Sequence, residues 1–210
     1  MRKFKIGSVE YKFDRYGVLH QLKPSPFEYN PLYCATYDNP EYTRQSELLQ
    51  ALRFGFATAV HGKPIQSLLD CGYGNGAFMN FAKKQVPVVY GHDISGVLVP
   101  SGCEFTDDMN IVCDVITYFD ALEHYPNVQF VKDLKAETII ISLPYFPGLD
   151  IFPTWKHRKP NEHLHFYTKE SLQKWMWKMG WRMVAVSKHE DIVRKSAVDW
   201  NILVAGFKRK

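Results

Sequence analysis

Apolar and polar residues alternate in blocks along the chain, and the blocks are of two kinds. Nearly continuous apolar runs, rich in Val, Ile and Leu, occupy residues 65–70, 86–92, 110–119 and 137–144. Such runs predict strands buried on both faces of a sheet. A short strand near 103–106 and a final pair at 181–188 and 200–207 complete the set. Helical spacing between the strands predicts an α/β fold with a mainly parallel sheet and an antiparallel C-terminal edge.

Helical stretches are expected at residues 40–62, 76–84, around 127–135 and 169–179. The first has an apolar stripe formed by Leu48, Leu49, Leu52, Phe56, Ala59 and Val60. Asn39 and Pro40 suit its N-cap and first position, and Gly62 suits its end. Thr168 and Gly180 bound the last helix in the same way.

The N-terminal region has a pattern of its own. Residues 4–22 alternate weakly around a turn at Asp14–Gly17, which predicts a β-hairpin. Residues 24–40 are rich in proline and tyrosine, and this composition predicts an ordered coil. We therefore expect an N-terminal hairpin and cap segment, residues 1–40, followed by a single α/β domain, residues 41–210.

The turn after the first buried strand is rich in glycine and reads SLLDCGYGNGAF, residues 67–78. Gly72, Gly74 and Ala77 fit the dinucleotide-binding spacing G-x-G-x-x-G/A, and Gly72, Gly74 and Gly76 fit G-x-G-x-G equally well. Glycines permit positive φ and close approach of a ligand to the backbone. Ligands of such sheets lie beyond the carboxyl ends of the strands, so a nucleoside-containing cofactor is expected on this turn.

Two carboxylates narrow the identity of that cofactor. Asp70 ends the strand before the glycines, where it would repel a pyrophosphate but attract an ammonium group. Asp93 lies at the end of the next strand, where an acid accepts hydrogen bonds from ribose; the alternative is an aspartate that only caps its own turn. S-adenosylmethionine carries an ammonium, a sulfonium and a ribose with two free hydroxyls, so the pair favours it over a nicotinamide dinucleotide.

Several stretches resemble the class I S-adenosylmethionine-dependent methyltransferases, in the family's order. They are LLDCGYGNGAF with its D-x-G-x-G-x-G motif, VYGHDIS with the ribose acid, CDVITYFDALEHYPN after the fourth strand, TIIISLPY in the fifth, and EHLHFYTKESLQKWMWKMGWRMV. The resemblance spans about residues 65–207 and is strongest to the small-molecule branch, which includes the ubiquinone-biosynthesis and trans-aconitate methyltransferases. It implies a Rossmann-like class I methyltransferase fold with a mainly parallel seven-stranded sheet.

The resemblance also implies the cofactor S-adenosylmethionine, the product S-adenosylhomocysteine, and a set of contacts. The matching cofactor-binding positions are Asp70, Gly72, Tyr73, Gly74, Gly76, Asp93, Ile94, Tyr118, Phe119 and Asp120. One stretch departs from the family, because residues 95–110 are short and contain a proline where a helix and an adenine-binding acid are usual. Either Asp107 or Asp108 could take that acid's role.

Three histidines are candidate catalytic bases, which methyl transfer requires only when the acceptor is a hydroxyl or an acidic carbon. His124, in ALEHYPN, could face the acceptor or orient a loop. His163 and His165 are two apart, so on a strand they would share a face. No carboxylate or cysteine completes a metal-ligand spacing with them, so no metal site is expected and one of the two is expected to be structural.

Information about the acceptor is expected in residues 144–167, because a loop of this length in a compact domain is usually functional or disordered. Its aromatic residues, which could wall an apolar acceptor, are Tyr145, Phe146, Phe152 and Trp155. The sequence KHRK at 156–159 could hold an anionic acceptor or form a solvated turn. The tyrosines expected to cover the cofactor or acceptor are Tyr29, Tyr33, Tyr37 and Tyr42.

Charge and composition limit the partners. The formal net charge is +4, but Arg2, Lys3, Lys5, Lys208, Arg209 and Lys210 lie at the two ends, and without them it falls to −2. A basic stripe on the fold, typical of nucleic-acid binding, is therefore not expected. The four cysteines form no C-x-x-C pair, and no apolar run is long enough to span a bilayer. We expect a cytoplasmic protein without a membrane partner; the oligomeric state stays open.

These observations favour methylation of a small-molecule acceptor, with oxygen as the acceptor atom. An RNA methyltransferase that uses the basic ends and KHRK, and an inert module that only binds the cofactor, stay open as alternatives. A nicotinamide-dependent oxidoreductase is disfavoured by Asp70 and by the missing second mononucleotide-binding half. Methylation of DNA amino groups is disfavoured because FDAL stands where that chemistry uses [DNS]-P-P-[YFW].

Overall fold

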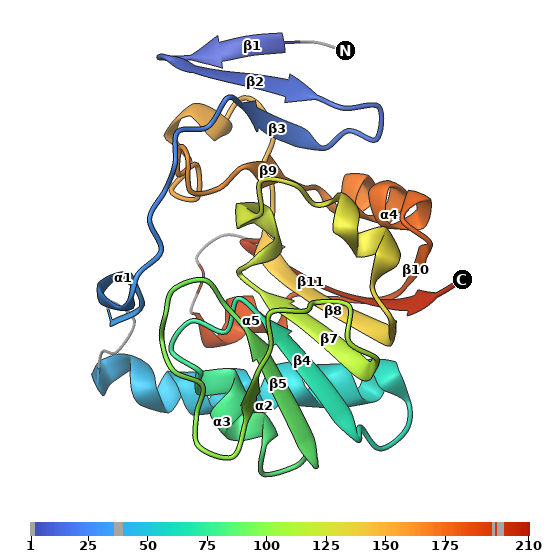
Figure 1. Ribbon diagram of the computed structural model, residues 1–210. Helices are drawn as coiled ribbons and strands as arrows, with labels where there is room; N and C mark the ends of the chain where they lie inside the picture. The colour runs from blue at the N-terminus through green and yellow to red at the C-terminus, as the bar shows by residue number, and fades with distance from the viewer. Residues whose placement is uncertain (1–2, 36–39, 195, 197–199) are drawn as a thin grey trace.

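The computed structural model (Figure 1) describes residues 3–35, 40–194, 196 and 200–210, with only the backbone described for 40–45. Its main sheet has seven strands in the order β10-β11-β8-β7-β4-β5-β6. The strands are β4 (Ser67–Cys71), β5 (Val88–His92), β6 (Glu104–Phe105), β7 (Cys113–Phe119), β8 (Ala136–Pro144), β10 (Trp181–Ser187) and β11 (Ile202–Arg209). The Rossmann-like fold expected from the sequence is confirmed.

The strand order places the glycine turn at a switch point of the sheet. From β4 the chain moves outward through β5 to β6, and then returns to β7 on the other side of β4. The pairs β4–β5, β4–β7, β5–β6 and β7–β8 are parallel, whereas β11 is antiparallel to both of its neighbours. The antiparallel C-terminal edge is therefore present, with β11 lying between β8 and the outermost strand β10.

Helices cover both faces of this sheet (Figure 1). On one face, α2 (Pro40–His61) packs with α3 (Ala77–Ala82) and α5 (His189–Val193). On the other face, α4 (Lys169–Lys178) and the 3₁₀ turns η1 (Leu122–His124) and η2 (Gln129–Asp133) share a core cluster with the sheet. Thr168 caps α4 as expected, because its hydroxyl accepts from the Ser171 amide at 3.1 Å.

Some expected elements differ in the structure. Residues 127–135 form the 3₁₀ turn η2 instead of an α-helix, and α5 was not expected at all. Residues 93–112, all of which the structure describes, contain no helix, in agreement with the short stretch noted in the sequence. The Asn39 cap lies outside the described residues. Gly62 follows α2 with a φ of +76°, a conformation that glycine adopts readily.

A second, antiparallel sheet lies above the main one in Figure 1 and has the order β1-β2-β3-β9. Its strands are β1 (Lys3–Ile6), β2 (Val9–Phe13), β3 (Leu19–Leu22) and β9 (His165–Phe166). The expected N-terminal hairpin, β2–β3, is thus enlarged by β1 on one side and by β9 from a distant segment on the other. The Asp14 carboxylate shapes the β2–β3 turn, since it accepts from the amides of Tyr16 at 2.8 Å and Val18 at 2.9 Å. The domain boundary at residue 40 stays a prediction.

The second sheet has a core of its own, and this core corrects one expectation. Its buried members are Tyr11, Leu19, Phe146, Phe152 and Phe166, with Trp155 packed against them. Phe146 and Phe152 are therefore used to hold the N-terminal sheet and do not wall an acceptor, whereas the half-buried Tyr145 and Trp155 stay candidates for that role. Two short helices complete the described elements: α1 (Pro31–Ala35) and η3 (Phe152–Thr154).

Candidate functional site

The backbone conformation of the glycine turn between β4 and α3 leaves space beside Gly74. Gly72, Gly74 and Gly76 have φ values of +74°, +55° and +73°, which other residues adopt only under strain. The Gly72 amide donates to the His92 carbonyl at 2.7 Å, so the turn is fixed to the end of β5. A Cβ on Gly72 would lie 2.7 Å from the Cβ of Ala121, whereas a Cβ on Gly74 would meet no atom within 4 Å. The turn is thus packed on one side and open on the other.

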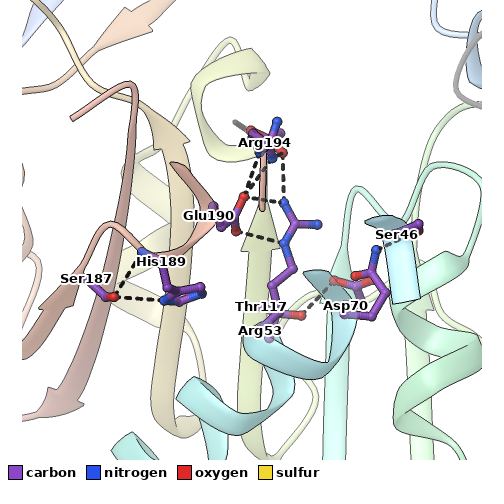
Figure 2. A network of polar contacts seen from close by, with 10 residues as sticks. Ser46, Arg53, Asp70, Thr117, Ser187, His189, Glu190 and Arg194 are labelled. Atoms are coloured by element: carbon purple, nitrogen blue, oxygen red, sulfur yellow. Dashed lines mark hydrogen bonds and ion pairs between the residues drawn. The ribbon is translucent and has the colours of Figure 1, made fainter. Parts of the chain in front are cut away.

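Asp70 is buried at the end of β4, with the turn just beyond it. It is 3% exposed, and the Thr117 hydroxyl of neighbouring β7 donates to its Oδ1 at 2.7 Å (Figure 2). Burial raises the pKa of Asp70 to about 7, and the Asp93 charge adds to this, although the Thr117 hydrogen bond and the Arg53 charge oppose it. A carboxyl with this pKa is poised to ionise when a cation binds beside it.

Asp93 joins the second strand to the glycine turn. Its Oδ2 accepts from the Gly74 amide at 2.8 Å, and its Oδ1 accepts from the Ser95 amide at 2.7 Å. The carboxylate therefore caps its own turn, as one of the alternatives held, and also fixes the glycine turn. Each carboxylate oxygen can accept a second bond, so a ribose contact is compatible with this geometry. Ile94 beside it is 74% exposed.

Tyr73 and the 95–110 stretch support the turn from outside. The Tyr73 ring is buried against Gly91, where a Cβ would lie 2.7 Å away, and its hydroxyl donates to the Val97 carbonyl. Pro100 packs on Gly76, where a Cβ would lie 2.7 Å from its Cγ. The proline that departs from the family pattern therefore closes over the turn. Only the backbone of Tyr73 is left to contact a ligand.

The two candidate adenine acids both lie on the surface. Asp107 and Asp108 are exposed after β6, and Asp108 accepts from the Asn110 amide at 2.8 Å within its own turn. The choice between them stays a prediction.

The end of β7 presents an aromatic ring and a carboxylate. Phe119 packs edge-on against Phe78 with ring centroids 4.7 Å apart, and the Arg53 guanidinium lies 4.4 Å from the Phe119 ring centroid. Asp120 follows with a φ of +52°. Tyr118, in contrast, has its side chain fully buried in the core, so only its backbone borders the site.

A buried ionic network anchors Asp120, and sequence reasoning did not find it. Figure 2 shows its members Arg53, Glu190 and Arg194. Arg53 of α2 donates to Glu190 of α5 at 2.8 and 3.0 Å and to Asp120 Oδ2 at 2.9 Å. Arg194 donates to Glu190 at 2.7 Å and to Asp120 at 2.5 Å. Burial alone would raise the pKa of Asp120, but the two guanidiniums outweigh it and hold that pKa well below its usual value. Asp120 is therefore ionised and fixed.

His124 and His163 meet in space with Glu123, which the sequence did not single out. The ring centroids of the two histidines are 4.6 Å apart, and His124 Nε2 lies 3.9 Å from Glu123 Oε1. Burial lowers the pKa of both imidazoles, that of His163 to about 2 with the His124 and Lys159 charges contributing. Burial and the Asp120 charge raise the pKa of Glu123 well above its usual value. Because His163 is 40 positions after Glu123 in the sequence, the proximity of these groups has no local sequence signal.

His165 lies elsewhere and has a structural environment. Its Nδ1 is 2.7 Å from His20 Nδ1, and its Nε2 is 2.8 Å from the Tyr125 carbonyl oxygen, so both ring nitrogens are bound within the fold. Burial lowers its pKa to about 4, with His20 adding to the effect. His163 and His165 do not share a face, because only His165 belongs to β9. His165 fits the expected structural member of the pair.

Comparison with known proteins adds to this geometry. A family model described as a methyltransferase domain matches residues 41–186. The chain belongs to the methyltransferase-domain family. No curated protein matches its sequence.

Solved structures share the fold of this methyltransferase. It is similar to 1,6-didemethyltoxoflavin-N1-methyltransferase of Burkholderia thailandensis, which is bound to 1,6-didemethyltoxoflavin and S-adenosylhomocysteine: 14% identity, 100% of both chains covered, TM-score 0.60. It is also similar to magnesium protoporphyrin IX methyltransferase of Synechocystis with bound S-adenosylhomocysteine: 17% identity, 77% of this chain and 83% of that one, TM-score 0.54. A third similar structure is a Haloferax volcanii putative methyltransferase in a complex with the Trm112 activator. The sequence identity is 9%, 88% of this chain and 99% of that one are covered, and the TM-score is 0.60.

The remaining acceptor candidates of the methyltransferase are largely bound within the chain. In KHRK, the His157 ring bonds Asn201 at 3.0 Å, Arg158 donates to the Pro153 carbonyl at 2.7 Å, and Lys159 donates to Glu162 at 2.8 Å. Lys156 lines a cavity of about 210 Å³ together with Arg194. The KHRK sequence thus contributes mainly to local structure.

Two of the N-terminal tyrosines contact the region of His124 and Glu162, and their role in covering the cofactor or acceptor stays a prediction. The Tyr29 hydroxyl is 2.8 Å from His124 Nδ1, and the Tyr33 hydroxyl donates to Glu162 at 2.8 Å. Residues 29–33 therefore cover the histidine cluster. Tyr37 and the Tyr42 side chain lie outside the described residues.

Proposed function

We propose that this methyltransferase transfers the methyl group of S-adenosylmethionine to an oxygen of a small-molecule acceptor and releases S-adenosylhomocysteine. The observation that carries the proposal is the buried Asp70 carboxyl beside a turn of three positive-φ glycines at the switch point of the sheet. This arrangement suits an ammonium group and a close backbone approach, and it disfavours a pyrophosphate. The solved structures that hold S-adenosylhomocysteine on the same fold support this cofactor.

The proposed contacts divide the cofactor into three parts. Asp70 and the open side of the glycine turn would hold the methionine part, Asp93 the ribose hydroxyls, and the exposed Ile94 the adenine ring. Phe119 and Asp120 would border the sulfonium at the end of β7. Because the leaving thioether is neutral, the protein chiefly has to align the acceptor, and such alignment can contribute about 7–11 kcal/mol.

The acceptor proposal is supported by charge and by the relatives. Two of the similar solved structures are methyltransferases named for the small molecules 1,6-didemethyltoxoflavin and magnesium protoporphyrin IX. In the described chain, the cationic groups Arg53, Arg194, Arg158 and Lys159 are engaged with protein acceptors near the site. An extended phosphate-binding face is therefore not formed by them. Among the described residues, no helix is long and apolar enough to cross a membrane.

Calorimetric titration with S-adenosylhomocysteine tests the cofactor directly, with NAD as the matched control ligand. We expect saturable one-to-one binding of S-adenosylhomocysteine in the micromolar range and none of NAD. Asp70→Asn removes the carboxylate but keeps its shape, and should weaken binding by about tenfold or more, because a charge-assisted bond is worth about 1.5–3 kcal/mol. Binding of NAD alone would overturn the proposal.

The same titration should depend on pH. Asp70 has a pKa of about 7 in the free protein, and a bound ammonium would lower that pKa. Below pH 7 the ligand must displace a proton, so affinity should rise with pH up to about 7 and then level off. The limiting slope is about tenfold per pH unit for one proton. Asp70→Asn should flatten this part of the profile, and an unchanged profile would contradict the assignment of Asp70.

A further inference from the structure

The cluster of Glu123, His124 and His163 is built unlike an ordinary buried polar group. One ligand-type atom from each residue lies within 4.8 Å of the other two. Glu123 is 2% exposed, and neither of its carboxylate oxygens has a hydrogen-bond partner among the described residues. Buried polar groups nearly always have such a partner, so this carboxylate is an exception that requires an explanation.

The hydrogen bonds of the two imidazoles orient their second nitrogen. His163 Nδ1 lies 2.8 Å from the His157 carbonyl oxygen, and His124 Nδ1 lies 3.0 Å from the Glu162 carbonyl oxygen. The His157 carbonyl oxygen only accepts, so the His163 ring donates from Nδ1 and carries the lone pair on Nε2. His124 Nδ1 also lies 2.8 Å from the Tyr29 hydroxyl, and that hydroxyl donates to the Glu162 carbonyl. This arrangement lets His124 take the same tautomer, with its Nδ1–H shared between the two oxygens. Anchoring of Nδ1–H on a backbone carbonyl is the arrangement that orients metal-binding histidines.

The cationic side chains around Glu123 are paired with other carboxylates. Arg53 and Arg194 are bound to Glu190 and Asp120. The Lys159 ammonium donates to Glu162 Oε1 at 2.8 Å, which also accepts from the Tyr33 hydroxyl. An ionised carboxylate in such a buried place is costly unless a positive charge joins it.

We propose that Glu123, His124 and His163 form a binding site for a divalent first-row transition-metal ion, with at least one coordination position left open. The ligands are Nε2 of each imidazole and one Glu123 oxygen, a set that suits Zn²⁺ and its neighbours better than Mg²⁺ or Ca²⁺. Bonds of about 2.0–2.2 Å span ligand atoms up to about 4.3 Å apart, so the side chains need to draw together only slightly.

The proposed metal site lies beside the turn that would hold the cofactor, which gives the ion a role in methyl transfer. This role rests on the proposed function. Glu123 and His124 lie in η1, directly after Asp120, and Ala121 packs against Gly72 of the cofactor turn. An acceptor hydroxyl that ligates the ion would have a lowered pKa. The O–CH₃ bond then forms as the S–CH₃ bond breaks, and the hydroxyl proton passes to solvent.

Metal binding is tested on protein freed of metal with a chelator. We expect one equivalent of Zn²⁺ by calorimetry and one of Co²⁺ by visible absorption, with a rise in Tm on Zn²⁺ addition. Glu123→Gln and His163→Asn should each weaken Zn²⁺ binding by at least tenfold. Glu137→Gln is the matched control, because this carboxylate is half exposed and pairs with Lys63 on the surface, and its Zn²⁺ affinity should equal that of the parent protein.

Far-UV circular dichroism and S-adenosylhomocysteine titration of each variant separate loss of metal from loss of fold. No saturation at one equivalent in the parent protein, or unchanged Zn²⁺ affinity in both folded site variants, would overturn the metal site. Saturable Zn²⁺ binding that both site variants lose, without S-adenosylhomocysteine binding by the parent, supports the metal site and overturns the proposed function. S-adenosylhomocysteine binding by the parent protein without saturable Zn²⁺ binding supports the proposed function and overturns the metal site.

Discussion

Replacement of Arg53 by Met is expected to lower the free energy of unfolding by about 3 kcal/mol. Arg53 is 7% exposed and holds Glu190, which is fully buried, through two hydrogen bonds at 2.8 and 3.0 Å. Removal of one partner from a buried pair typically costs about 3–5 kcal/mol, because the other charge stays buried. The lower end applies because Arg194 still bonds Glu190 at 2.7 Å. Urea unfolding followed by circular dichroism measures the change.

Two further variants test whether the loss of stability in Arg53→Met comes from the Glu190 carboxylate that stays buried without Arg53. Lys63→Met removes a surface ion pair of similar length, 2.9 Å to Glu137, with both side chains about half exposed. Its cost should stay below about 1 kcal/mol. The double change Arg53→Met with Glu190→Leu should recover part of the lost stability, since it removes the stranded carboxylate as well. Equal costs for Arg53→Met and Lys63→Met would refute this view of the network.

The second large effect is expected at Gly72. Ala at this position would require a φ of +74° and would place its Cβ 2.7 Å from that of Ala121. The left-handed conformation alone costs about 1–2 kcal/mol, and overpacking adds about 1–3 kcal/mol. We expect Gly72→Ala to lower the free energy of unfolding by about 2–5 kcal/mol, as measured by urea unfolding.

Gly74→Ala provides the matched control on the same turn. Its φ is +55°, but its Cβ would meet no atom within 4 Å, so only the backbone cost of about 1–2 kcal/mol applies. The added methyl group would occupy the open side of the turn. Gly74→Ala should therefore remain better folded than Gly72→Ala and still bind S-adenosylhomocysteine at least tenfold more weakly than the parent protein. Unimpaired binding would show that the cofactor does not approach Gly74.

The sequence predicted those features that depend on neighbouring residues. The buried strands could be found because β4, β7 and β8 are apolar on both faces, and the turn because glycine is needed where φ is positive. Thr168 marked the start of α4 through a local hydrogen bond. These signals lie within a few residues of the element that they specify.

Features that depend on distant pairing could not be found in this way. The strand β9 has only two residues, and its identity depends on β3, about 145 positions earlier. Phe146 and Phe152 have the composition of an acceptor pocket, but the N-terminal sheet needs them as its core. Glu123 has no local feature that separates it from a surface acid; only the fold brings His163 beside it.

The position of β11 has a consequence for how the chain folds. This strand is the last of the seven in chain order, yet it joins β8 to β10 through antiparallel ladders on both sides. While the chain is being synthesised, β8 therefore presents an unpaired, mainly apolar edge until the residues of β11 have emerged, and β10 has no neighbour to join. Such edges recruit other chains. A nascent chain of this protein should thus need protection from association until β11 is made.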